Sequence, residues 1–261
     1  GLDSSPRQIA AGRALVEQLG LKNITLLCMD ILDVTSDLGQ FDYIIAHGVY
    51  SWVSPPVQDR ILRICKQNLA PTGVAYVSYN TYPGWHMMNI IRDAMLYHTR
   101  KLTDPQERAT QARVMLDFLA ECVPAEKKAY SAFLKTYAHF LRGELKDAGP
   151  QGDAFLLHDE LEEVNIPVYF YQFMERAAEN GLQYLAEADF PTVFPDKFSP
   201  EARQALQRMA HDIIEMEQYM DFLRNRMFRQ TLLCHAAVTV QRRMTPDRVR
   251  GLYIASRARP V

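Results

Sequence analysis

Short apolar runs and amphipathic segments alternate along residues 1–102. Continuous apolar runs predict buried strands at 24–29, 41–46 and 74–79. Apolar residues at helical spacing predict helices at 5–19, 55–69 and 87–101. Ser5-Pro6 suits the start of the first helix, since serine caps free amides and proline fits the first turn. The alternation predicts an α/β fold with a parallel sheet.

The pattern changes near Leu102, where helical spacing takes over. A broad apolar stripe runs from Tyr130 to Leu141, and Ser199-Pro200 suits the start of a long helix that reaches Met216. Proline at position 167 indicates a break between two short helices. We therefore expect two domains, 1–102 with the sheet and 103–261 mainly α-helical.

Polar residues or glycine stand where the predicted strands end. They are Asp3, Asp30, His47-Gly48 and Asn80. In a parallel sheet, ligands bind outside the carboxyl ends of the strands. We expect these positions to converge on one crevice.

Charge and cysteine content narrow the possible partners. The net charge of −2 gives no basic footprint for nucleic acid. No apolar run reaches the ~18 residues that a membrane span needs, and no signal peptide is evident. The four cysteines form no CxxC pair, and neither they nor the histidines have metal-ligand spacing. A cytoplasmic protein with reduced thiols and no metal is expected.

Two acidic residues could bind an adenosine group. A carboxylate ending a strand, as Asp3 does, can accept both ribose hydroxyls. Asp30, after the following strand, could accept a hydrogen bond from an adenine amino group. Each also has a purely structural interpretation, because Asp3 could cap the next helix and Asp30 could be a solvated loop acid.

The stretch FDYIIAHGVYSWV carries the densest set of candidates. Ala46, His47 and Gly48 could present backbone groups to a cofactor, and Gly48 permits close approach. His47, Tyr50 and Trp52 are the candidate catalytic residues of a polar, aromatic rim, since aromatic faces attract cations and histidine titrates near neutral pH. The alternatives are a structural histidine and a packed Tyr–Trp pair.

Two further segments could contact a substrate. The candidates are Tyr79, Asn80 and Tyr82 in SYNTYPGW and His158 in the helical half. Asn, Pro and Gly also form turns for local reasons, and His158 could belong to ordinary capping and surface chemistry.

Together these residues give residues 1–100 the character of a known family. Residues 1–100 resemble a class I S-adenosylmethionine-dependent methyltransferase, which has a Rossmann-like sheet. The resemblance begins at the end of that family's second strand. Residues 156–190 and 221–235 resemble the methyltransferase regulatory domain that follows it in a group of bacterial proteins. The resemblance implies that Asp3 binds the ribose and that Asp30 with Ile31 binds the adenine edge. It implies that Ala46, His47 and Gly48 face the methyl donor and substrate.

One part of the family pattern is missing. The first strand and the glycine-rich GxGxG loop should precede Leu2, and no such glycine spacing occurs in the sequence. We expect an incomplete methyltransferase domain at 1–102, a helical regulatory or substrate domain at 103–261, and a trimmed C-terminal end. We also expect this chain to bind S-adenosylmethionine poorly and to be inactive alone.

The resemblance implies that the intact parent transfers a methyl group to a lysine amine or a small molecule. Some relatives resemble protein-lysine methyltransferases. Two alternatives stay open: a non-catalytic helical interaction module and an NAD-binding oxidoreductase. The methyl acceptor, the oligomeric state and the role of the helical half also stay open.

Overall fold

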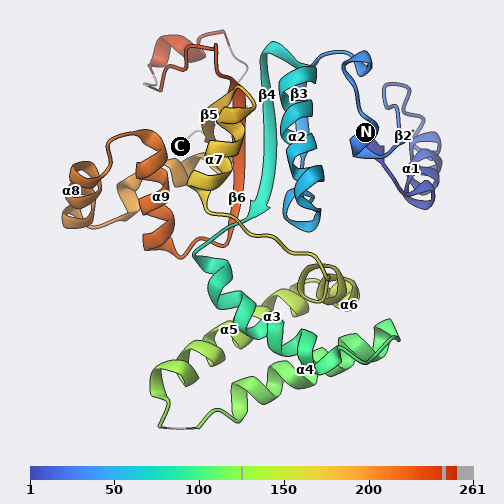
Figure 1. Ribbon diagram of the computed structural model, residues 1–261, viewed down its shortest axis with the longest axis vertical. Coiled ribbons are helices and arrows are strands. Elements are labelled where there is room, and N and C mark those ends of the chain that lie inside the picture. The colour runs from blue at the N-terminus through green and yellow to red at the C-terminus, as the bar shows by residue number, and fades with distance from the viewer. Residues whose placement is uncertain (125, 243–244, 252–261) are drawn as a thin grey trace, which may run out of the picture.

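A lobe built on β-sheet stands above a lobe of helices in the computed structural model, which describes residues 1–124, 126–242 and 245–251 (Figure 1). The helical lobe is formed by residues 84–161, which leave the sheet lobe after β4 and return to it before α7. The chain therefore crosses between the lobes twice.

The sheet lobe holds two separate sheets. Strand β1 (Leu2–Asp3) pairs in parallel with β2 (Leu27–Cys28), and α1 (Pro6–Gln18) connects them. The larger sheet has the order β3-β4-β6-β5. Its strands are β3 (Phe41–Ala46), β4 (Leu69–Asn80), β5 (Leu182–Glu187) and β6 (Phe228–His235). β3 and β4 are parallel, and β6 runs antiparallel to both β4 and β5.

Two helices cover one face of the larger sheet. Helices α2 (Pro55–Asn68) and α7 (Phe170–Glu179) pack on the side from which Ala75, Val77 and Tyr79 point. Helices α8 (Pro200–Met209) and α9 (Ile213–Arg224) extend this lobe beside α7 (Figure 1). On the other face, Tyr43 and Ile45 of β3 are 74% and 71% exposed. The described part of the chain places no helix over these two side chains.

The helical lobe has its own apolar core. It contains α3 (Gly84–Thr99), α4 (Pro105–Glu121), α5 (Lys128–Asp147), α6 (Gly152–Phe155) and the π-helical turn Leu156–Glu160. Ile91, Leu116 and Leu134 are among the buried residues that hold it together. The remaining helical turns of the chain are short: Ile31–Asp33, Ser36–Leu38, Tyr50–Trp52, Gly149–Gln151, Phe190–Val193, Pro195–Lys197 and Pro246–Val249.

The two crossings between the lobes are hydrogen-bonded to each other and to the start of β6. Thr81 donates from Oγ1 to the Val168 carbonyl at 2.7 Å and from its backbone to the Met227 carbonyl at 2.9 Å. The Gly84 amide donates to the Arg226 carbonyl at 2.9 Å. This crossing region fixes where the helical lobe lies below the carboxyl ends of β3 and β4.

The structure confirms the α/β class and changes several elements. The predicted strand at 24–29 is only Leu27–Cys28, and the strand predicted at 74–79 is part of the longer β4, Leu69–Asn80. Strands β5 and β6 were missed, and the long helix from 200 is two helices, α8 and α9. Because β5 and β6 pair beside β4, the expected boundary at residue 102 does not separate the sheet from the rest of the chain.

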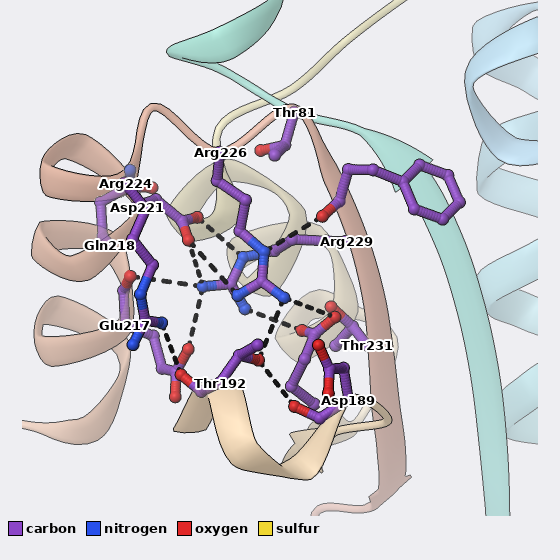
Figure 2. Close-up of polar contacts among 12 residues, drawn as sticks. Thr81, Asp189, Thr192, Glu217, Gln218, Asp221, Arg224, Arg226, Arg229 and Thr231 are labelled. Atoms are coloured by element: carbon purple, nitrogen blue, oxygen red, sulfur yellow. Dashed lines mark hydrogen bonds and ion pairs between the residues drawn. The ribbon is translucent and has the colours of Figure 1, made fainter. Parts of the chain in front are cut away.

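A buried cluster of charges explains why β6 was missed. Arg229 is fully buried and lies on the inner face of β6, where an apolar residue would be expected. Its guanidinium donates to Asp221 Oδ2 at 2.7 Å and to Glu187 Oε2 and Glu217 Oε2 at 3.0 Å each (Figure 2). It also lies 3.8 Å from the centre of the Phe170 ring. A charged residue at this buried position breaks the apolar pattern that would have indicated a strand.

Candidate functional site

A cavity of about 630 Å³ lies between the two sheets. One wall comes from β1, β2 and the turn after β2, and the other from β3 and the inner face of α2. Apolar side chains such as Val34, Val49 and Ile61 form most of its lining. The site is thus an apolar cavity bordered by the ends of three strands.

Asp3 and Asp30 meet at one edge of this cavity. Leu2 pairs with Leu27 and Asp3 with Cys28, so the parallel register brings the two acids to neighbouring strand ends. In each carboxylate, Oδ1 accepts a local amide: Asp3 from Ser5 at 2.7 Å and Asp30 from Leu32 at 2.8 Å. Among the described residues, none donates to Oδ2 of either acid. Both acids therefore cap a local turn, as the structural interpretation expects, and each keeps one carboxylate oxygen free of local partners.

The predicted cofactor-binding residues divide into two sets. Asp3, Asp30, Ile31 and Ala46 line the cavity. His47 and Gly48 do not line it, although their neighbours Ala46 and Val49 do. Gly48 has a φ of +67°, a backbone conformation that favours glycine. It allows the chain to turn away from β3 just beyond the cavity.

His47 is held by two side chains of β4. Its Nδ1 is 2.9 Å from the Tyr76 hydroxyl and 3.3 Å from Ser78 Oγ, which also accepts the Gly48 amide at 2.8 Å. The His47 side chain is exposed, so its Nε2 faces solvent. Sequence reasoning missed Tyr76 and Ser78. The available signal was the alternation in β4, which puts both on the face opposite Val77.

Tyr50, predicted in a polar, aromatic rim, and Tyr79, predicted as a substrate contact, are both buried. Tyr50 is fully buried and packs edge-to-face on Phe173 with ring centres 5.2 Å apart. Tyr79 is 1% exposed, stacks on Phe173 and contacts Thr231 Oγ1 through its hydroxyl at 3.0 Å. Burial raises the pKa of both hydroxyls above the ordinary value. Both side chains belong to the apolar core that the sheet forms with α2 and α7, and neither can touch a ligand in this structure.

Two family models match the chain. The one described as a methyltransferase domain matches residues 1–73, and the one described as a predicted methyltransferase regulatory domain matches residues 152–235. The first covers both acids and the cavity wall. The second covers α7, β5, α9 and β6.

Solved structures and curated sequences agree with these models. The structure of PKMT2 from Rickettsia typhi in complex with AdoHcy matches with a TM-score of 0.82 and 38% identity over 95% of this chain. The uncharacterized protein RP028 of Rickettsia prowazekii is 38% identical over 185 residues, which is 71% of each protein. The chain belongs to the class I S-adenosylmethionine-dependent methyltransferase family. The match to the regulatory domain places it in the group that carries this second domain.

The chain is shorter than several of these relatives. The R. prowazekii protein RP789 is 41% identical over 254 residues, which are 97% of this chain and 44% of that protein. The chain likewise covers 46% of the PKMT2 chain.

Three further predicted residues, Trp52, Tyr82 and His158, are half-buried or exposed. Trp52 is half-buried and packs edge-to-face on Trp85, with ring centres 6.3 Å apart. Tyr82 is half-buried and stacks on His86 at 3.9 Å. His158 is exposed on the π-helical turn of the helical lobe. Of these, Trp52, Tyr82 and His158 keep surface that a substrate could contact.

Asn80 has a structural role. It is 6% exposed, and its amide side chain donates to Asn165 Oδ1 at 2.9 Å. Its backbone amide donates to Ser51 Oγ at 2.8 Å. The Ser51 carbonyl in turn accepts the Ile166 amide at 2.8 Å. Asn80 therefore joins the end of β4 to the chain returning from the helical lobe, and little of its side chain remains for a substrate.

The described residues contain neither a group suited to a metal ion nor a helix that could span a membrane. No group of three or more His, Cys, Asp or Glu side chains suited to a metal ion occurs within 1–124, 126–242 and 245–251. Over the same ranges, no helix is both long and apolar enough to cross a bilayer.

Glu160, beside His158, is a buried acid in the helical lobe. It is 3% exposed, and burial together with the nearby Asp159 charge raises the pKa of its carboxyl to about 7, although Arg92 opposes the shift. Its ordinary value is 4.5. Between pH 4.5 and about pH 7, Glu160 is therefore protonated in the folded state and ionised in the unfolded state. Stability from this group is greatest below pH 4.5 and falls as the pH rises through about 7.

Replacing Glu160 by glutamine is expected to remove that pH dependence. Relative to the wild type, Glu160→Gln should gain about 1–3 kcal/mol between pH 5 and pH 8, because glutamine carries no charge to desolvate. Thermal unfolding at both pH values checks this. Glu163→Gln, an exposed acid three residues on, should show no such gain. Equal behaviour of the two variants would contradict the buried-acid interpretation.

Proposed function

We propose that this chain forms the adenosine half of an S-adenosylmethionine site and part of the acceptor entrance of a methyltransferase. The observation that carries the proposal is that Asp3 and Asp30, from two neighbouring strand ends, line one apolar cavity and each keep a free carboxylate oxygen. The related PKMT2 is solved in complex with AdoHcy, the product form of that cofactor.

The residues present fit an adenosine group. The free oxygen of Asp3 would accept the ribose hydroxyls, and that of Asp30 the adenine amino group. Ile31 and the apolar cavity lining would pack on the ring faces. Ala46 to Gly48 would face the methyl donor. When bound, the cofactor supplies a methyl group already activated by its sulfonium centre, so alignment and exclusion of water are the tasks left to the protein.

We propose a protein lysine amine as the acceptor. The ammonium form has no lone pair, so the amine must lose a proton before it attacks. His47 suits this task, because Tyr76 and Ser78 engage Nδ1 while Nε2 faces solvent. Trp52 and Tyr82 offer partly exposed aromatic surface for the methylene stem. The support from the relatives is the name of PKMT2 and its similarity to this chain.

A chimaera of this chain and PKMT2, the relative whose structure contains AdoHcy, gives the sharpest test. In a chimaera, residues 1–261 replace the matching 46% of PKMT2, and calorimetry measures S-adenosylhomocysteine binding. Asp3→Asn keeps an oxygen for the Ser5 amide but loses the acceptor for ribose. It should weaken binding about 10- to 100-fold, the effect of losing hydrogen bonds to a charged group.

Asp33→Asn is the matched control. Asp33 is exposed in the turn after Asp30 and does not line the cavity, so its variant should bind like the unmodified chimaera. A folded chimaera that does not bind, or equal effects of the two variants, would overturn the proposed site. The interaction-module interpretation would then be preferred.

A further inference from the structure

A second groove lies between α7 and the start of α9, and it shares no lining residue with the cavity between the sheets. Its volume is about 500 Å³. Its lining residues are Tyr171, Met174, Glu175, Ala178, Asp212, Ile214, Glu215, Gln218 and Tyr219. We call it the α7–α9 groove.

The charged residues that line the α7–α9 groove are all acidic. Glu175, Asp212 and Glu215 line it, and no lysine or arginine does. Asp212 caps α9 by accepting the Glu215 amide at 2.8 Å, and Glu215 contacts His211 Nδ1 at 2.9 Å. Glu175 is exposed, and no side chain of the described residues hydrogen-bonds or ion-pairs with it. The groove therefore offers carboxylate charge to a cation from outside.

Its remaining surface suits the apolar part of a long basic side chain. Met174, Ala178 and Ile214 supply aliphatic lining, and Tyr171 and Tyr219 supply aromatic surface. Lysine and arginine lay their methylene stems along such surface, and their charged ends are attracted to carboxylates and to ring faces. The lining thus complements both parts of a basic side chain.

An independent observation concerns Gln218, which lies in the same groove. Its side chain is 94% buried, since 6% is exposed. Its Oε1 accepts the Tyr171 amide at 3.1 Å, while no acceptor among the described residues pairs with its buried Nε2. A buried donor without a partner is costly, and Nε2 is itself closed off from solvent, so a peptide carbonyl could satisfy it only after the side chain turns toward the groove.

We propose that the α7–α9 groove binds an extended, lysine- or arginine-containing peptide segment of a partner protein. Glu175 and Glu215 would pair with the basic side chains, and the Gln218 side chain would turn so that Nε2 donates to a backbone carbonyl of the peptide. The inference does not depend on the proposed methyl transfer, because the groove lies outside the cofactor cavity.

Fluorescence polarisation with two labelled peptides tests this. The first alternates lysine with leucine and glycine, and the second has glutamate in place of lysine. The lysine peptide should bind and the glutamate peptide should not, with binding that weakens from about 50 mM to about 500 mM salt as exposed charges are screened. Glu175→Lys should weaken binding at least about tenfold, because it places a like charge against the peptide.

Glu144→Lys is the matched control. Glu144 is exposed in the last turn of α5, so its variant makes the same change of charge on the other lobe and should retain binding within about twofold. Gln218→Leu, checked for folding by circular dichroism, should also weaken binding. If Gln218→Leu fails to fold, the comparison of Glu175→Lys with Glu144→Lys still tests the proposal.

Three results would overturn the proposal. One is no binding of the lysine peptide to the wild type, and another is an equal loss in Glu175→Lys and Glu144→Lys, which indicates general charge attraction. The third is a dimer in sedimentation that Glu175→Lys dissociates, because a second copy would then occupy the groove.

Discussion

Arg229→Ala is expected to destabilise the sheet lobe by about 3–5 kcal/mol, enough to unfold much of the protein at 37 °C. Arg229 is fully buried, and its guanidinium pairs with Glu187, Glu217 and Asp221 (Figure 2). Burial alone would lower its pKa, but the Asp221 charge and hydrogen bond hold that pKa well above the ordinary value. Without the guanidinium, buried carboxylates lose their main partner.

The pH dependence of the Arg229 variant separates lost charge pairing from lost volume. In Arg229→Ala, protonation removes the uncompensated charge, so the folded carboxyls bind protons more readily than the unfolded ones. The variant should therefore recover part of its loss as the pH falls from 7 toward 5. A cavity alone would cost the same at both pH values.

Urea unfolding followed by circular dichroism measures both effects. Arg208→Ala, at an exposed position of α8, should stay within about 0.5 kcal/mol of the wild type. Arg229→Lys keeps the charge but not the forked set of donors, so it should fall between the two. A loss in Arg229→Ala as small as in Arg208→Ala would contradict the assigned role of the cluster.

Gly84→Ala is expected to cost about 1–3 kcal/mol, the usual effect of adding a methyl group where nothing can move aside. An alanine Cβ at this position would lie 2.6 Å from the Arg226 carbonyl oxygen and 2.8 Å from its carbon. Both are backbone atoms, and the Gly84 amide is already hydrogen-bonded to that carbonyl. The substitution would push β6 away from the start of α3 and loosen the crossing region.

Gly143→Ala is the control of opposite sign. Gly143 lies within α5, and no atom comes within 4 Å of an added Cβ. The substitution should therefore stabilise the protein by about 0.5–1 kcal/mol, since alanine loses less conformational freedom in a helix than glycine does. Urea unfolding of both variants checks the pair. A neutral Gly84→Ala would show that the contact with Arg226 is not fixed.

Local patterns in the sequence were enough to predict the main elements in the first half of the fold. The apolar run at 41–46 is β3 as observed, and Ser5-Pro6 begins α1 with the Ser5 side chain accepting the Gln8 amide. Asp3 and Asp30 could be placed at one edge because neighbouring parallel strands end on the same side. These features depend on residues close in sequence or on a general rule of parallel sheets.

Other predictions failed where distant residues decide the environment. Tyr50 and Tyr79 look free to contact a ligand, but Phe173 of α7, far along the chain, packs against both rings in the core. Asn80 looks like a free turn residue, yet its partner Asn165, 85 residues further on, comes from the segment that returns from the helical lobe. Sequence spacing carries no information about such partners.

The sequence by itself thus determined the α/β class, the acids at the strand ends, and the likeness to methyltransferases, because each depends on residues that are close together in the sequence. Only the tertiary structure decided that β6 joins β4, that a buried arginine is satisfied by three acids, and that His47 is held by Tyr76 and Ser78. The physical reason is that burial and charge pairing are properties of neighbours in space, and those neighbours come from segments that the sequence keeps far apart.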